Sequence, residues 1–228
     1  MIVTIDGPAG SGKSTAARQL AARLGFRFLD TGAMYRAVAL ECVTRGVPPE
    51  SEEAVAAIAD RVRIELPAER VLVDGRDVTE AIRSPEATAA ASYVAVHPEV
   101  RRALVRLQRE AAAGGNVVSE GRDQGTVVFP DAECKFFLTA DAEERARRRW
   151  AEFRAQGSEV SFEELLTSIR DRDERDEQRA VAPLKPAADA TVIDTSHRTI
   201  EEVLAELERV VRDHRESIER ASRDRSVP

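Results

Sequence analysis

The first residues of the chain constrain its fold more than any other stretch. A short apolar run, Ile2–Asp6, leads without a break into the segment Gly7–Thr15. That segment fits the pattern G-x-x-x-x-G-K-[ST], in which glycines let the backbone turn sharply and direct N–H groups at a phosphate. β-branched residues precede it, and apolar residues at helical spacing follow from Ala16 to Leu24. We therefore expect a strand, a loop and a helix that bind a nucleoside triphosphate.

Two side chains of this loop have expected roles of their own. Lys13 can reach the β- and γ-phosphates, and the hydroxyl of Ser14 is a suitable ligand for Mg²⁺. A helix that opens near Lys13 adds the positive end of its dipole. The alternative is a glycine-rich turn that binds nothing, and the complete motif between a strand and a helix argues against it. The residues expected to bind ATP are Gly7, Pro8, Ala9, Gly10, Ser11, Gly12, Lys13, Ser14 and Thr15.

Composition argues against several other classes of protein. The chain has 228 residues and a net charge of −7, which disfavours a protein that coats nucleic acid. No apolar run is long enough to cross a membrane, and the first residues form a strand rather than a signal peptide. Cys42 and Cys134 lack the spacing of metal ligands, so we expect buried free thiols. We expect a cytoplasmic protein with no membrane or nucleic-acid partner.

Apolar runs and helical patterns alternate along most of the chain. After Ile2–Asp6, the runs typical of core strands are 26–30, 116–120, 134–138 and 190–194. Five strands that alternate with helices indicate a three-layer α/β fold with a five-stranded parallel sheet. Ligands of such sheets lie at the carboxyl ends of the strands, which is where Arg122 and Asp123 follow the third run.

The middle of the chain interrupts this alternation. We expect a turn at Thr31-Gly32, and Ser51 is the expected N-cap of a later helix. The other elements expected here are helices over 33–45, 51–62, 84–94 and 98–112 and short strands over 63–66 and 71–74. We interpret the region as an insertion within one domain over residues 1–228. Its parts are a core (1–36, 114–140 and 187–212), the insertion (about 37–113), a lid (about 141–186) and a polar, mobile tail (213–228).

Two expected helices, 140–156 and 161–179, are rich in arginine. By helical spacing, Arg145, Arg148 and Arg149 share one face of the first helix. The residues that share a face of the second are Arg172, Arg175, Asp176 and Arg179. Alone, such helices are typical of a solvated surface with ion pairs between turns. Beside a phosphate-binding loop they favour a lid, because guanidinium groups bind phosphate oxygens in pairs and a closed lid excludes water.

Four stretches together resemble the bacterial cytidylate kinases, which belong to the nucleoside monophosphate kinase group. They are Ile5–Pro8, Leu29–Arg36, Gly121–Pro130 and Arg175–Leu184, in the family's order and spacing. The resemblance covers residues 2 to about 210, and the last two stretches are its most specific part. It implies a three-layer P-loop fold with an inserted monophosphate-binding subdomain and a helical lid. It also implies transfer of the γ-phosphoryl group of ATP to CMP or dCMP, with Mg²⁺.

The resemblance implies roles for single residues. Lys13 and either Arg148 or Arg149 would act on the phosphoryl group in transfer, and 194–196 would lie near the adenine ring. The residues implied to bind CMP are Thr31, Arg36, Ser92, Arg101, Arg122, Asp123, Arg172, Asp176 and Arg179. Within this set Arg36 and Arg122 would hold the phosphate, with Thr31 at the mouth of that site. Ser92, Arg101 and Asp123 would read the cytosine, and Asp176 would accept hydrogen bonds from the ribose, with Arg172 and Arg179 beside it.

Asp123 has a chemical reason to select cytosine. Cytosine carries an amino donor that a carboxylate can pair with, whereas uracil has a carbonyl oxygen at the same position. A buried carboxylate without a donor costs on the order of 1–3 kcal/mol, which disfavours uracil. The alternatives are that Arg101 is a helix-surface residue and Ser92 a small packing residue. No general base is required, because the acceptor phosphate is already ionised.

Several other side chains carry weaker expectations. Gln124 replaces a residue that is usually apolar, and we expect it to affect packing alone. Glu120 is either an acid that bonds a water of the Mg²⁺ ion or a plain strand-end carboxylate. We expect His97 to be a turn or cap residue. Trp150 and Phe153 are the expected apolar anchors of the lid.

Two other functions remain open at this point. The nearer one is a kinase with another small acceptor, such as UMP or a non-nucleotide alcohol. The more distant one is a regulatory ATPase that uses the loop and the arginines as a conformational switch, and whose slow hydrolysis would not depend on a monophosphate. We expect a monomer, because no extended apolar face is evident in the sequence.

Overall fold

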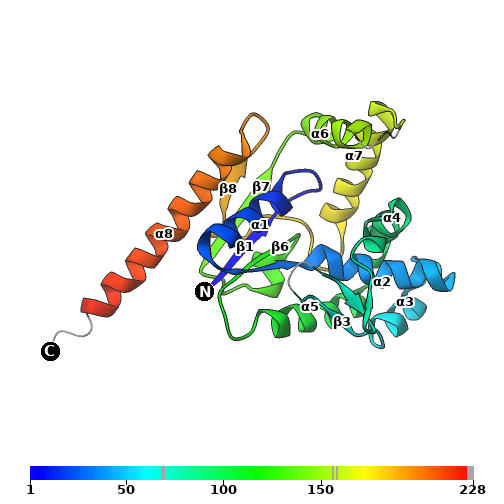
Figure 1. Cartoon of the computed structure of the whole chain (residues 1–228), viewed down its shortest axis with the longest axis horizontal. Coiled ribbons are helices and arrows are strands. Elements are labelled where there is room, and N and C mark those ends of the chain that lie inside the picture. Colours follow the sequence, from blue (N-terminus) through cyan, green and yellow to red (C-terminus); the bar gives the residue numbers. More distant parts are fainter. Residues whose placement is uncertain (68–69, 156, 158, 225–228) are drawn as a thin grey trace.

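The protein is described here by a computed structural model that covers residues 1–67, 70–155, 157 and 159–224, with side chains through residue 220. Figure 1 shows a central sheet between helices, with a lobe of shorter elements on one side and the long helix α8 on the other. The sheet has five parallel strands in the order β2-β6-β1-β7-β8. Their bounds are β1 Ile2–Asp6, β2 Arg27–Asp30, β6 Val117–Gly121, β7 Cys134–Thr139 and β8 Thr191–Asp194. The expected five-stranded parallel sheet is confirmed.

Helices cover both faces of this sheet, so its central strands are buried. Every residue of β6 is buried, as expected for a strand that is covered on both sides. On one face, Leu20 and Leu204 from two helices pack with Phe136 of β7. On the other face, Leu29 and Val117 pack with Phe129. The helices of the core and of the arginine-rich region are α1 Lys13–Leu24, α6 Ala142–Ala155, α7 Phe162–Gln178 and α8 Ile200–Asp224.

The ends of these helices follow from local sequence. Gly25 ends α1 in a left-handed conformation, and its N–H donates to the carbonyl of Ala21. At the start of α7, the hydroxyl of Ser161 accepts a hydrogen bond from the N–H of Glu164 at 3.1 Å. The Glu164 carboxylate accepts one from the N–H of Ser161, which completes a capping box.

The inserted region has its own small sheet and its own core. Three short strands pair antiparallel in the order β3-β4-β5. Val38, Ile82 and Leu104 lie in the apolar cluster of this lobe, which is separate from the clusters on the main sheet. The elements are α2 Thr31–Arg45, α3 Glu52–Ala59, β3 Ile64–Glu65, β4 Leu72–Val73, β5 Arg76–Asp77, the 3₁₀ helix η1 Ala81–Arg83, α4 Pro85–Val94 and α5 Pro98–Ala112.

Several expected boundaries in this lobe are wrong. Thr31 and Gly32 form the first turn of α2 rather than a separate turn, because the Asp30 carboxylate caps the helix by accepting from the N–H of Ala33 at 2.8 Å. α3 ends at Ala59, before the expected end at residue 62. β5 was not expected, since its two residues are polar and exposed and show no apolar alternation.

The end of the chain is helical for longer than its sequence indicates. α8 extends to Asp224, so the polar segment after residue 213 continues the helix as far as the structure describes it, whereas residues 225–228 lie outside the described residues. Mobility of this tail stays a prediction. Among the residues that the structure describes, no helix combines the length and the apolar character needed to cross a membrane.

Candidate active site

The phosphate-binding loop lies at the carboxyl end of the central strand β1. Gly12 precedes α1 with φ 82°, a left-handed conformation that the absence of a Cβ atom permits. The Lys13 ammonium donates to the carbonyl of Pro8 at 3.2 Å, across the inside of the loop. From the outside, Arg145 of α6 donates to the carbonyl of Ala9 at 3.1 Å. The loop is therefore held in its concave form from both sides.

Lys13 and Glu120 form a buried pair at the base of the loop. Their charged atoms lie 3.9 Å apart, and the Ser14 hydroxyl donates to the other Glu120 oxygen at 2.9 Å. Burial lowers the pKa of Lys13 to about 7, and the nearby cation Arg122 acts in the same direction. Burial likewise raises the pKa of Glu120, an effect that Lys13 opposes. Ser14 and Glu120 are therefore in direct contact.

One cavity opens on the outer side of the loop and has a volume of about 690 Å³. Its wall combines the loop with residues that follow β8 and residues of α6. The lining residues that bear on the argument are Gly12, Lys13, Thr15, Arg148, Thr195 and His197. The segment after β8 therefore faces the loop across this cavity.

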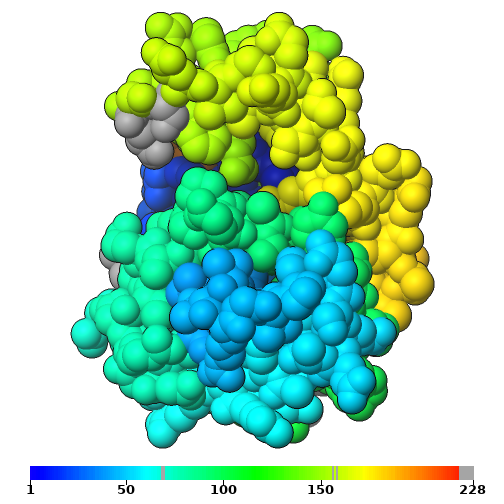
Figure 2. Space-filling model, turned by 90° about the vertical axis from the view of Figure 1, so that its right-hand side faces the viewer, coloured from blue at the N-terminus to red at the C-terminus, as the bar shows by residue number. Residues whose placement is uncertain are grey.

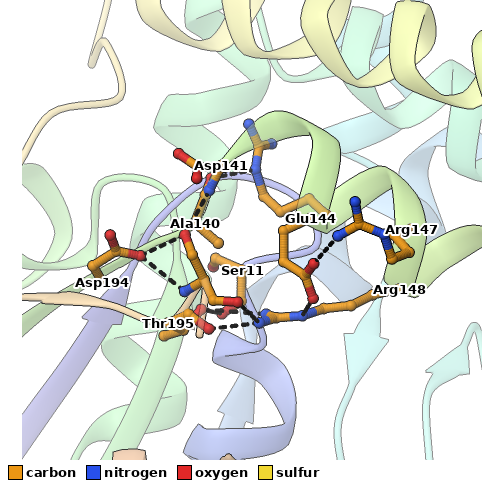
Figure 3. A network of polar contacts seen from close by, with 10 residues as sticks. Ser11, Ala140, Asp141, Glu144, Arg147, Arg148, Asp194 and Thr195 are labelled. Atoms are coloured by element: carbon orange, nitrogen blue, oxygen red, sulfur yellow. Dashed lines mark hydrogen bonds and ion pairs between the residues drawn. The ribbon is translucent and has the colours of Figure 1, made fainter. Parts of the chain in front are cut away.

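A hydrogen-bond network joins the segment after β8 to the loop and to α6 (Figure 3). Thr195 donates from its hydroxyl to the carbonyl of Ser11 at 3.0 Å. Arg148 donates to the carbonyl of Thr195 at 2.5 Å and to the carboxylate of Glu144 at 3.1 Å. Arg148 is therefore fixed on the outer side of the loop, whereas Arg149 lines both this cavity and the next one.

A second cavity, of about 480 Å³, lies between the loop, the inserted lobe and the arginine-rich helices. In the space-filling view, a hollow separates the yellow-green residues of α6 and α7 from the green and cyan residues of the inserted lobe (Figure 2). Dark blue residues from the beginning of the chain are visible at its floor. All nine residues expected to bind the monophosphate line this cavity: Thr31, Arg36, Ser92, Arg101, Arg122, Asp123, Arg172, Asp176 and Arg179.

Asp123 and Arg101 form one wall of this cavity as a buried ion pair. The Asp123 carboxylate accepts a hydrogen bond from the Arg101 guanidinium, and both side chains are about 4% exposed. Arg101 also donates to the carbonyl of Ala95 at 3.2 Å and lies 5.7 Å from the ring centre of Tyr35. Ser92 is on the same wall, with its hydroxyl bonded to the carbonyl of Ala89 at 2.9 Å. The alternative that Arg101 is a helix-surface residue is therefore wrong.

Asp176 is the main carboxylate on the opposite wall. It accepts a hydrogen bond from Arg122 at 2.8 Å. Burial alone would raise the pKa of Asp176, but Arg122, Arg172 and Arg179 outweigh it and hold this pKa below its ordinary value. The carboxylate is therefore ionised among its neighbouring cations.

The arginines around this carboxylate outnumber their partners. The Nε atoms of Arg36, Arg172 and Arg179 are buried and have no hydrogen-bond partner within the part of the chain that the structure describes. Burial lowers the pKa of Arg172 to about 10, and the cations Arg122, Arg149 and Arg36 add to this effect. Buried guanidinium groups that repel one another form a site that is suited to an anion with several oxygens.

The remaining side chains singled out from the sequence line the cavity or lie outside it. Thr31 lines the cavity, but its hydroxyl donates to the carbonyl of Glu120 at 2.7 Å. His97 is the N-cap residue of α5, as expected, and its ring bonds the carbonyl of Pro49. Trp150 donates to the carbonyl of Val160 at 3.1 Å, which fits an anchor, whereas Phe153 lines the cavity beneath Arg149.

Sequence reasoning missed residues that hold the site in place. Asp30 caps α2 and also accepts from Arg36 at 3.0 Å. Asp173 binds Arg145 through two hydrogen bonds of 3.1 and 2.6 Å, which joins α7 to α6 and to the loop. Asp6 bonds the backbone after Asp123. Asp6 and Asp173 have partners that are distant in sequence, so no local pattern identifies them. Asp30 is different, since its partners Ala33 and Arg36 follow it closely and an aspartate before a helix is a local N-cap signal.

Gln124 makes polar contacts that the sequence did not indicate. It begins a single turn of π-helix, η2 Gln124–Val128, and is completely buried. Its side chain accepts from the Ser119 hydroxyl at 2.8 Å and donates to Gln108 at 3.2 Å. The residue therefore belongs to a buried polar network beneath the cavity, so the expectation of an effect on apolar packing alone is wrong.

The fold and the loop define a class of protein, the α/β proteins of the P-loop type. A solved structure of an uncharacterised protein from Eubacterium ventriosum ATCC 27560 shares this fold with a TM-score of 0.50. The two chains are 11% identical, and the match covers 92% of this chain and 98% of the other.

Sequence comparison narrows the class to one family. The family model for cytidylate kinase matches residues 3–213. A cytidylate kinase from Desulfitobacterium hafniense (strain Y51) is 52% identical over 205 residues, which is 89% of this chain and 88% of that protein. One from Stutzerimonas stutzeri (strain A1501) is 50% identical over 209 residues, 89% of this chain and 91% of that protein. The chain belongs to the cytidylate kinase family.

The lowered pKa of Lys13 gives a testable prediction for triphosphate binding. At pH 8 a lysine with a pKa of about 7 is mostly neutral, and phosphate oxygens favour its charged form. Binding of ATP without divalent cations at pH 8 should therefore take up protons, and the affinity should fall as the pH rises above 7. Calorimetry in two buffers of different ionisation enthalpy measures this uptake.

The control for this measurement is Lys13→Met. This variant should bind ATP more weakly and with little proton uptake, because the group that titrates has been removed. Equal uptake by the variant and the natural protein would assign the proton to another group, and no uptake by either would contradict the lowered pKa.

Proposed function

We propose that this protein transfers the γ-phosphoryl group of ATP to CMP, which gives ADP and CDP, and that it also accepts dCMP. The observation that carries the proposal is the shared wall of the two cavities, since Gly10, Lys13, Ser14 and Arg149 line both. A phosphoryl group that moves from one cavity to the other would pass directly over Lys13. Membership of the cytidylate kinase family and the names of the relatives support CMP as the acceptor.

We assign the acceptor phosphate to Arg36 and Arg122, with Thr31 beside them in the wall. Arg36 has a buried Nε without a partner among the described residues, so it can add a hydrogen bond when a phosphate arrives. Asp30 holds Arg36 in a position to do so, at 3.0 Å. Arg122 is held in the same way by its bond to Asp176. A phosphate in this position is already ionised and needs only to be oriented and partly neutralised.

We assign the cytosine ring to the wall formed by Ser92, Arg101 and Asp123. The carboxylate of Asp123 can accept from the exocyclic amino group, and the Arg101 guanidinium can donate to an acceptor of the ring. Because the two side chains already bond each other, each is oriented before the nucleotide binds. Asp176, with Arg172 and Arg179 beside it, would then contact the ribose.

We assign the transition-state charge to Lys13 and Arg149. Both line the two cavities, so both can follow the phosphoryl group during its transfer. Arg148 is the less suitable of the two adjacent arginines, since its guanidinium bonds the carbonyl of Thr195 on the outer side of the loop. There it would contact the adenosine part of ATP, next to 194–196.

The residues present fit Mg²⁺ as the metal that accompanies ATP. The Ser14 hydroxyl and a Glu120 carboxylate oxygen lie 2.9 Å apart beside the loop, and both are hard oxygen ligands of the kind that this ion prefers. Ser14 would bind the ion, and Glu120 would accept a hydrogen bond from one of its waters. When bound, the ion neutralises charge on the β- and γ-phosphates.

The setting of the reaction is also part of the proposal. ATP and CMP are small cytoplasmic molecules, and their conversion belongs to pyrimidine nucleotide metabolism, so we propose a cytoplasmic enzyme. We further propose that it acts as a monomer, because no extended apolar face is evident in the sequence.

The first prediction of this proposal concerns which monophosphates the protein phosphorylates. With ATP and Mg²⁺, release of ADP should be fast with CMP or dCMP, at least about a hundredfold slower in kcat/KM with UMP or AMP, and negligible with no acceptor. A coupled assay for ADP measures all five conditions. Fast turnover with UMP would favour a kinase that accepts UMP as well as CMP. ATP hydrolysis at a rate that does not depend on any monophosphate would support a regulatory ATPase instead.

The two adjacent arginines of α6 give a second, paired prediction. Arg149→Met should lower kcat by a factor on the order of 10² to 10³ with small changes in the KM of either substrate, because it removes charge stabilisation from the transition state. Arg148→Met should mainly raise the KM for ATP.

Steady-state kinetics of both variants, with ATP and CMP varied in turn, make this comparison. The two variants remove the same charge from adjacent positions, so each controls for the other. The reverse pattern, with the larger loss of kcat in Arg148→Met, would contradict the assignment.

A further inference from the structure

Asp6 is a buried carboxylate to which the proposed reaction gives no role. It is the last residue of β1, is 4% exposed, and lies in register between Gly121 of β6 and Phe137 of β7. The phosphate loop begins at the next residue, but the hydrogen bonds that the structure describes for Asp6 do not go to that loop. One carboxylate oxygen accepts from the N–H of Gln124 at 2.8 Å, and the other accepts from the N–H of Gly125 at 2.8 Å.

These two bonds fasten the chain immediately after Asp123. The carbonyl of Asp123 itself accepts from the N–H groups of Val127 and Val128, at 2.9 and 3.1 Å. Its backbone is therefore fixed by the turn that follows it, and Asp6 fastens the start of this turn to the central strand. The Asp123 side chain emerges from this anchored segment toward Arg101.

The chemistry of the contact requires a carboxylate. Two N–H donors converge on two separate oxygens, and an amide side chain would present an NH₂ group to one of them. Burial raises the pKa of Asp6 to about 7, and the two backbone hydrogen bonds act against this rise. The Asp123 charge raises the pKa further and the Arg122 charge lowers it. Burial favours the neutral acid and the two backbone hydrogen bonds favour the charged form, so the bonds to this segment are what stabilise the carboxylate there.

We infer that Asp6 is a positioning residue for the acceptor base. Its carboxylate holds Gln124 and Gly125 against β1, so that the Asp123–Arg101 pair faces the acceptor cavity. The inference rests on the proposed function, since the base in question is that of the acceptor nucleotide. It assigns Asp6 to the acceptor side although the residue is adjacent in sequence to the donor loop.

The donor loop has supports of its own, so the two sides can be separated by experiment. Arg145 holds the carbonyl of Ala9, Lys13 holds that of Pro8, and Thr195 holds that of Ser11. None of these bonds involves Asp6. Loss of its carboxylate should therefore affect the acceptor much more than ATP.

The test compares Asp6→Asn with Thr4→Val. Thr4 is a matched control, because it lies on the same strand two residues earlier and is completely buried. Its hydroxyl has no hydrogen-bond partner in the described structure, and it lies close to the same segment, since a Cβ atom added at Gly125 would come to 3.0 Å from it. Both variants remove or alter one polar group without changing the size of the side chain.

We expect Asp6→Asn to raise the KM for CMP about tenfold, the effect of losing one charge-assisted hydrogen bond. The preference for CMP over UMP in kcat/KM should fall by a similar factor, while the KM for ATP changes less than about twofold. Asp123→Asn serves as the positive control for lost preference, and Thr4→Val should match the natural protein. An unchanged KM for CMP, or equal increases for CMP and ATP, would overturn the inference.

A measurement without turnover separates this inference from the proposed function. Amide hydrogen exchange at Gln124 or at Gly125 should be at least about tenfold faster in Asp6→Asn than in Thr4→Val, because the asparagine keeps one accepting oxygen and turns its NH₂ group toward the other N–H. Unchanged exchange would overturn the clamp. If the natural protein does not turn over CMP, the proposed function fails, and the exchange rates still decide whether Asp6 holds the segment. If Asp6→Asn does not fold, Asp6→Ser carries the same expectations.

Discussion

Repulsion among buried cations is the interaction on which the whole site depends. Burial and Arg122 together lower the pKa of Lys13, and Arg172 is destabilised by its own burial and by neighbouring arginines. The cavity between the loop and the inserted lobe is lined by nine cationic side chains and five carboxylates, so the carboxylates do not match the cations in number. A polyphosphate relieves the repulsion, so the protein gives up stability in the empty site to gain affinity for phosphate at a defined position.

The parallel sheet determines where these charges meet. The carboxyl ends of β2, β6 and β1 lie side by side, and each leads into a different part of the site. β1 leads into the phosphate loop, β6 into Arg122 and Asp123, and β2 into the helix that carries Arg36. The arginine-rich helices are joined to the same point, because Arg145 bonds both the loop and Asp173. The donor and acceptor sides therefore share one rigid edge.

Much of the fold and of the site was predictable from the sequence, and most of the contacts that were not predicted have a physical reason in common. The loop and the five strands carry local patterns, and the structure brings together in one cavity the nine residues that the family resemblance implies for the acceptor. The contacts of Asp6 and Asp173 were not predicted, since each depends on which element lies opposite in the folded chain, whereas Asp30 caps the helix that follows it and its local signal was overlooked. Gln124 was misjudged for the same reason as Asp6 and Asp173, because its partners Ser119 and Gln108 come from two other elements.

The central claim is that donor and acceptor phosphates meet over Lys13 within one chain. It is tested most directly by calorimetry with a compound that links the 5′ positions of adenosine and cytidine through five phosphates. The account predicts one molecule bound per chain, at least about a hundredfold more tightly than ATP, with both ATP and CMP excluded. An affinity no greater than that of ATP, or continued binding of CMP to the complex, would contradict it.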